Sequence, residues 1–125
     1  MKTLCRPSLL LVLLATWLAA SLEAQTATVI PDTEAAQHVG QQATVEGTVV
    51  AVFTSKNGNT LLNFGGRYPN QTFTGWVPAG TPLASDPALR SLQGTSVKIT
   101  GTVTLYKGKP EIRITSKEQI QQDED

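Results

Sequence analysis

A strand pattern with a glycine at its centre occurs twice in this chain, and it constrains the fold more than any other feature. Residues 40–49, GQQATVEGTV, and residues 94–103, GTSVKITGTV, have the same spacing of two glycines followed by Thr and Val. In both copies apolar and polar residues alternate with a period of two, as in half-buried strands. A glycine inside such a strand permits the bend that lets a short sheet curl and close on itself. The repeat therefore predicts a small closed barrel.

Turn-forming residues divide the chain around these two long strands. The predicted strands span residues 44–54, 60–64, 71–77, 96–106 and 111–115. Short helices are expected near Asp32 and where Asp86 precedes Pro87, because Asp is a good N-cap and Pro fits the first helical turn. Three strands, a helix and two strands is the order of the OB-fold. We therefore expect an all-β, five-stranded Greek-key OB-fold barrel over residues 43–117. One short helix would lie between its third and fourth strands and another near its N-terminus.

Alternation along the strands assigns one face of each to the core. Val49 and Val103 are expected at matching buried places in the two copies. On the third strand Phe73 points inward, which leaves Trp76 on the outer face. The remaining residues expected inward on the two long strands are Val45, Gly47, Ala51, Phe53, Val97, Ile99, Gly101 and Leu105.

Residues 1–24 have the composition of a secretory signal peptide. Lys2 and Arg6 precede an apolar run over residues 9–20, which has the length of a signal-peptide core and is short for a membrane span. Cleavage is expected after Ala24, with a boundary near Ala20 as the alternative and an uncleaved anchor as the remaining interpretation. We therefore predict a periplasmic or secreted protein, in which residues 25–42 form a lead-in and a short helix.

Loss of the signal peptide changes the composition of the mature chain. It removes Cys5, the only cysteine, so the mature protein would have no disulfide. It also removes two cations and one anion from a chain with no net charge, which leaves one excess negative charge. The overall charge therefore does not indicate a polyanion binder. The charge is uneven, however, because a polar acidic tail over residues 118–125, predicted to be disordered from Gln119 onward, contrasts with cations in the turns between strands.

Two stretches also resemble a known family. Residues 59–74, NTLLNFGGRYPNQTFT, look like the second and third strands of bacterial OB-fold domains of the nucleic-acid-binding type, some of which are attached to thermonuclease-like proteins. Residues 105–112, LYKGKPEI, are similar to the hairpin between the fourth and fifth strands of such domains. The resemblance covers nearly all of the mature chain and implies an exported OB-fold module. The chain departs from the pattern at Gly75 and Trp76, where small aliphatic residues are expected, and no nuclease module is present.

Signatures of catalysis are scarce. The sequence has a single histidine, His38, and no P-loop, GxSxG motif or cluster of metal ligands. Glu46 and Glu111 are isolated carboxylates on strand faces, and we expect them to be solvated or ion-paired. We therefore predict a protein that is not an enzyme and that uses no metal or cofactor.

Binding chemistry is better supported. OB-folds bind oligonucleotides or oligosaccharides on the face of strands two and three, between the loops that follow strands one and four. There, lysines can neutralise phosphates and exposed aromatic rings can stack on bases. The alternative is that the tyrosines only pack loops and the lysines only solubilise the protein. The candidate site residues are Lys56, Asn57, Asn63, Arg67, Tyr68, Trp76, Tyr106, Lys107, Lys109 and Arg113.

Two functions of different classes fit these residues. The first is weak binding of single-stranded nucleic acid by a small exported module. The second is an envelope interaction module that uses the same face for a glycan, a peptide or a protein. A salt titration separates them, because binding to phosphates weakens steeply with salt.

Overall fold

The structure is a computed structural model that describes residues 28–123. The predicted signal peptide and the last two acidic residues lie outside the described residues. Within them, no helix is long and apolar enough to cross a membrane.

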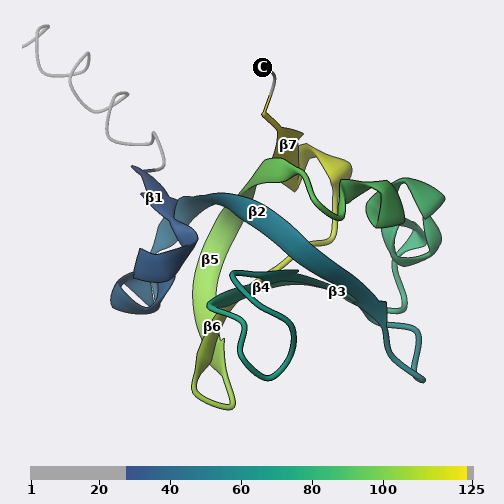
Figure 1. Cartoon of the computed structure of the whole chain (residues 1–125), viewed down its shortest axis with the longest axis horizontal. Helices are drawn as coiled ribbons and strands as arrows, with labels where there is room; N and C mark the ends of the chain where they lie inside the picture. Colours follow the sequence, from purple (N-terminus) through teal and green to yellow (C-terminus); the bar gives the residue numbers. More distant parts are fainter. Residues whose placement is uncertain (1–27, 124–125) are drawn as a thin grey trace, which may run out of the picture.

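The described chain is predominantly β, as predicted (Figure 1). Its strands are β1 (Thr28–Pro31), β2 (Gln42–Thr54), β3 (Thr60–Phe64), β4 (Phe73–Val77), β5 (Ser96–Tyr106), β6 (Lys109–Arg113) and β7 (Ile120–Gln122). Short 3-10 helices connect them: η3 (Asp32–His38), η4 (Pro82–Ser85), η5 (Pro87–Leu92) and η6 (Lys117–Gln119). Two such helices, rather than the single predicted one, fill the connection between β4 and β5.

Hydrogen bonding between strands forms a ring. The sheet order is β1-β2-β3-β4-β6-β5-β7, and an additional pairing of β2 with β5 closes a ring through β3, β4 and β6. All ring contacts are antiparallel except the parallel pairing of β4 with β6. Figure 1 shows β2 and β5 as long, bent strands that cross each other in this view. The fully buried side chains inside the ring include Val45, Val49, Leu62, Phe64, Phe73, Val97, Ile99, Val103, Ile112 and Ile114.

The sequence repeat corresponds to a local twofold symmetry between β2 and β5. The Gly40 backbone N–H donates to the Val103 carbonyl at 2.7 Å, and the Gly94 N–H donates to the Val49 carbonyl at the same distance. Gly40 and Gly94 have φ values of 89° and 88°, a left-handed conformation that glycine adopts without strain. Val49 and Val103 are both fully buried, as predicted. The first glycine of each repeat therefore ends a helical segment and hydrogen-bonds to the other repeat.

The second glycine of each repeat is required by close packing. A Cβ atom at Gly101 would lie 2.6 Å from Ile112 Cγ2, well inside van der Waals contact. A Cβ at Gly47 would lie 2.7 Å from Asp32 Oδ1 and 3.0 Å from Phe64 Cδ2. Glycine therefore lets neighbouring elements approach β2 and β5 where these strands bend.

The prediction that Phe53 points inward was wrong. The pairing of β2 with β3 shifts between Val49 and Ala51, which indicates a β-bulge. Beyond the bulge, Val52 pairs with the buried Leu62, so the following residue turns to the outer face. Phe53 is consequently 55% exposed. The bulge reverses the alternation on which the prediction depended.

Leu105 was also predicted to lie in the core and does not. It is the penultimate residue of β5, and it is 54% exposed. Its partner in the pairing with β6 is Pro110, at the end of the hairpin. The strand therefore extends past the core, and alternation alone does not reveal where the core ends.

The prediction of a disordered C-terminal tail was wrong for the residues that the structure describes. β7 pairs antiparallel with β5, and the Gln119 side-chain amide donates to the carbonyls of Thr100 and Arg113, both at 2.9 Å. The predicted lead-in is also ordered from Thr28, because β1 pairs in parallel with β2. Polar composition did not reveal these segments, since backbone groups make the pairings.

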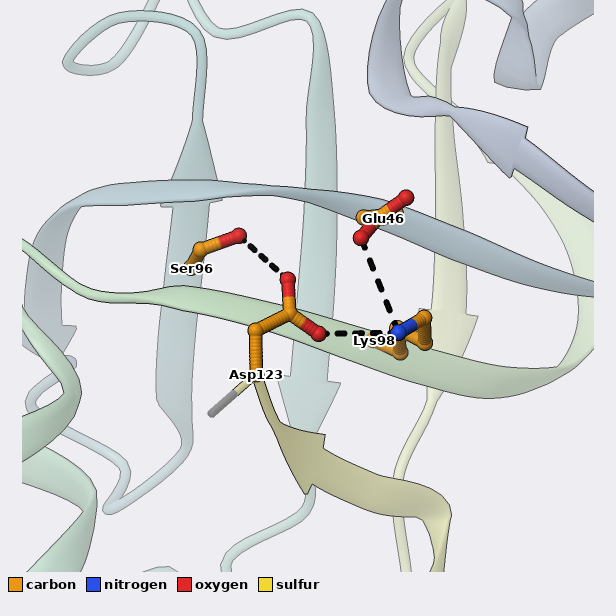
Figure 2. Close-up of polar contacts among 4 residues, drawn as sticks. All are labelled: Glu46, Ser96, Lys98 and Asp123. Carbon is orange, nitrogen blue, oxygen red and sulfur yellow. Dashed lines mark hydrogen bonds and ion pairs between the residues drawn. The ribbon is translucent and has the colours of Figure 1, made fainter. Parts of the chain in front are cut away.

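Asp123 anchors the end of the described chain (Figure 2). Its carboxylate accepts hydrogen bonds from Ser96 Oγ at 2.6 Å and from Lys98 Nζ at 2.9 Å. The Ser96 hydrogen bond, followed by that of Lys98, lowers the pKa of Asp123. Glu46 Oε2 lies 3.6 Å from Lys98 Nζ, which confirms the ion pairing expected for this carboxylate.

Candidate functional site

A groove of about 370 Å³ lies on the outer side of the ring. We call it the outer-face groove. Strands β3, β4 and β6, the end of β5 and the loops that follow β2 and β3 all contribute to it. Of the ten predicted site residues, it is lined by Asn57, Asn63, Tyr68, Trp76, Tyr106 and Lys109. Its other lining residues, which were not predicted to belong to the site, are Ser55, Asn59, Leu61, Gln71, Thr74 and Glu111.

Aromatic rings from three separate elements meet at this groove. Tyr68 comes from the loop between β3 and β4, Trp76 from β4 and Tyr106 from the end of β5. Tyr68 is 69% exposed and Tyr106 is 58% exposed, whereas Trp76 is partly buried. Flat, accessible rings of this kind can stack on bases or sugars. Trp76 does lie on the outer face, as the alternation along β4 predicts.

The four other predicted residues lie outside the lining of the groove. Lys56, Arg67, Lys107 and Arg113 are all exposed. Two of them rest on its aromatic residues: Arg113 Cζ lies 5.4 Å from the centre of the Trp76 ring, and Lys107 Nζ lies 5.3 Å from that of Tyr106. These are cation–π distances. Lys107 and Arg113 therefore border the groove, and part of the Trp76 surface is already covered.

The polar groups on the floor of the groove form most of their hydrogen bonds within the protein. Asn63 is 3% exposed, and its Oδ1 accepts a hydrogen bond from Thr74 Oγ1 at 3.1 Å. Asn63 was predicted to offer amide hydrogen bonds to a ligand, and this contact with β4 occupies one lone pair of its amide oxygen. Lys109 is also held, since its Nζ donates to the Gln71 backbone carbonyl at 3.0 Å.

Two acceptors in the groove have no partner in the described part of the chain. Gln71 is 8% exposed, and its buried Oε1 makes no hydrogen bond. Glu111 is partly buried, and burial raises the pKa of its carboxyl group. The only side-chain ion pairs among residues 28–123 are those of Lys98. Glu111 thus forms no ion pair in this range, and its partly exposed carboxylate on the groove side of β6 agrees with the expectation of a solvated group.

Metal-binding groups do not gather here or elsewhere in residues 28–123. No group of three or more His, Cys, Asp or Glu side chains in that range could hold an ion. His38 lies near Gln41, with 3.0 Å between its Nδ1 and the Gln41 Oε1.

Comparison with solved structures supports the fold. The chain is similar to OBody AM1L10 bound to hen egg-white lysozyme, with 18% identity and a TM-score of 0.57 over 80% of this chain and 97% of that one. OBody AM3L09 bound to the same lysozyme gives 16% identity and a TM-score of 0.52 over 78% and 96%. The protein has an OB-fold-like β structure. At these identities the likeness extends to the fold alone.

A third structure gives the same result. A protein described as an aspartyl-tRNA synthetase from Leishmania major Friedlin is 11% identical, with a TM-score of 0.51 over 84% of this chain. The chain spans 25% of the length of that synthetase. No protein-family model matches the chain, and no curated protein sequence matches it either.

Proposed function

We propose that this protein is an exported OB-fold module that binds single-stranded nucleic acid weakly in the outer-face groove. In this proposal β2, β3, β4, β6 and β5 are the five strands of a Greek-key OB barrel. The observation that carries it is the convergence of Tyr68, Trp76 and Tyr106 on one groove that cations border. OB-folds bind oligonucleotides on the corresponding face, so the position of the groove agrees with the chemistry.

Stacking would supply most of the affinity. Each base that stacks on an aromatic side chain contributes roughly 1–3 kcal/mol, without dependence on sequence. Tyr68 and Tyr106 are accessible for this, and Trp76, with Arg113 against its ring, supplies a third aromatic surface. Such contacts suit a chain of bases that are already unstacked and solvent-exposed.

The bordering cations would hold the phosphates. Lys56, Arg67, Lys107 and Arg113 are exposed, and none forms an ion pair with a residue of the described chain. Together with Lys109 in the groove, they place positive charge along the aromatic surface. The uneven distribution of charge therefore supports binding of a polyanion even though the net charge does not. The ligand would be extracellular or imported nucleic acid, given the predicted export to the periplasm or the medium.

Recognition of a glycan, peptide or protein of the envelope is the second candidate. The observation that favours it is the composition of the groove itself, in which Lys109 is the only cation and Glu111 is an anion. Aromatic walls, amides and a carboxylate can bind sugar hydroxyls equally well. The similar OBody structures are bound to a protein, hen egg-white lysozyme.

Fluorescence anisotropy of a labelled oligo-dT across a salt series tests the proposal. We expect weak binding at low salt with a negative log–log slope of up to about 3.5, since five contacts to single-stranded phosphates contribute about 0.7 each. Lys117→Ala is the control variant and should bind as the wild-type protein does. Lys117 is exposed and lies in η6, outside the groove. Absence of binding at low salt would reject the nucleic-acid proposal and favour the envelope partner, for which binding of oligosaccharides should change little with salt.

A further inference from the structure

Glu111 is the charged group in the groove that the fold itself does not use. It lies on the outer face of β6, where it pairs with Thr74 of β4 on one side and Thr104 of β5 on the other. This position is the floor of the outer-face groove, between the strands that carry Trp76 and Tyr106. A ligand stacked on these rings would therefore lie beside the strand that carries the carboxylate.

The cations beside Glu111 are engaged elsewhere. Lys109 and Arg113 each lie two residues from Glu111 on β6, so the alternation along the strand puts all three on one face. Lys109 donates instead to the Gln71 carbonyl, and the Arg113 guanidinium lies over the Trp76 ring. Because Glu111 is partly exposed and forms no ion pair with a residue in 28–123, its carboxylate is available to accept hydrogen bonds from a bound group. Gln71, which also lines the groove, has a buried Oε1 without a hydrogen-bond partner in the described chain.

We propose that Glu111 makes the groove selective for guanine among the bases of a single strand, an inference that rests on the proposed function. A carboxylate only accepts hydrogen bonds, and its two oxygens can accept two parallel ones. Guanine alone presents two adjacent donors on its Watson–Crick edge, the N1–H and the N2 amino group. Adenine and cytosine present one donor beside an acceptor, and thymine presents one donor between two acceptors, so each would place a lone pair against the carboxylate.

The test compares thymidine nonamers whose central base is guanine, hypoxanthine, adenine, cytosine or thymine, by anisotropy at neutral pH and low salt. A single guanine avoids quadruplexes, and hypoxanthine lacks only the N2 amino group. We expect the guanine oligomer to bind about tenfold more tightly than all-thymidine, the discrimination typical of one bidentate contact, with hypoxanthine between them. In Glu111→Gln this ratio of affinities should fall close to one, because Gln offers one acceptor and one donor. Lys117→Ala should keep the ratio.

The outcomes separate the two proposals. Equal binding of all five oligomers by the wild-type protein would overturn the guanine inference and leave the proposed function standing. Binding of none would overturn both. A guanine preference that persists in Glu111→Gln, with a melting curve that shows a folded variant, would assign the preference to another group and overturn the role of Glu111.

Discussion

A methyl group at Gly101 should destabilise the protein severely for so small a change. The added Cβ would lie 2.6 Å from Ile112 Cγ2 and 3.3 Å from Gln119 Nε2, whereas ordinary contacts lie at 3.4–4 Å. Ile112 is fully buried and paired with Val103 of the same strand as Gly101, so it has no space into which to move. Overpacking of this kind costs about 1–3 kcal/mol.

Thermal unfolding followed by circular dichroism measures the effect. One kcal/mol shifts the melting temperature of a domain of this size by about 4–8 °C, so Gly101→Ala should melt roughly 5–20 °C below the wild-type protein. Gly80→Ala is the matched control. A Cβ there meets nothing within 4 Å, and its φ lies outside the left-handed region. We expect this variant to be neutral or slightly stabilised, because alanine restricts the unfolded chain.

A second substitution identifies the clash. Ile112→Leu moves the methyl branch away from Cβ, so it removes the atom that the new Cβ would meet. The double variant should therefore lose less stability than the sum of the single variants, with a coupling on the order of 1 kcal/mol. A Gly101→Ala protein that melts within about 2 °C of wild type, or purely additive effects in this cycle, would refute the packing explanation.

The remaining predictions concern the groove and export. Trp76→Ala should weaken oligo-dT binding by about tenfold, as loss of one stacking surface requires, while the protein stays folded; equal losses of binding and folding would contradict this. Replacing Lys107 and Lys109 together by Ala should flatten the salt dependence by up to about 1.4 log–log units, and an unchanged slope would exclude their contact with phosphate. Burial raises the pKa of Glu111, so the folded state binds this proton more tightly than the unfolded state does. The free energy of unfolding of the wild-type protein should therefore fall as pH rises from the usual Glu range through that raised pKa. Urea titrations at several pH values measure this fall, which Glu111→Gln should remove. Identical pH profiles for the two proteins would refute the contribution of Glu111. Mass spectrometry of protein from its native host should give a mature start near Gln25, and an intact N-terminus would contradict cleavage.

Local sequence patterns were sufficient to predict the main strands of the ring. The bounds of β3 and β5 agree with the prediction, because alternation and turn residues act over a few positions. The glycine spacing predicted the equivalence of the two long strands, and Val49 and Val103 occupy matching buried places. Outward orientation of Trp76 followed from the same alternation. These features depend on neighbours in the sequence, which can be read directly.

Only the tertiary structure revealed what depends on distant partners. The β-bulge in β2 turns Phe53 outward because β3 fixes the register there, and β7 is ordered because β5 offers backbone groups to it. Six of the predicted site residues line one groove, but no local motif marked Gln71 or Glu111 as part of it. Both are ordinary polar residues in a strand or loop. The folded strands bring these two residues into one groove, where Lys109 and Arg113 contact other groups instead of the Glu111 carboxylate. No local sequence pattern encodes which partner each cation takes.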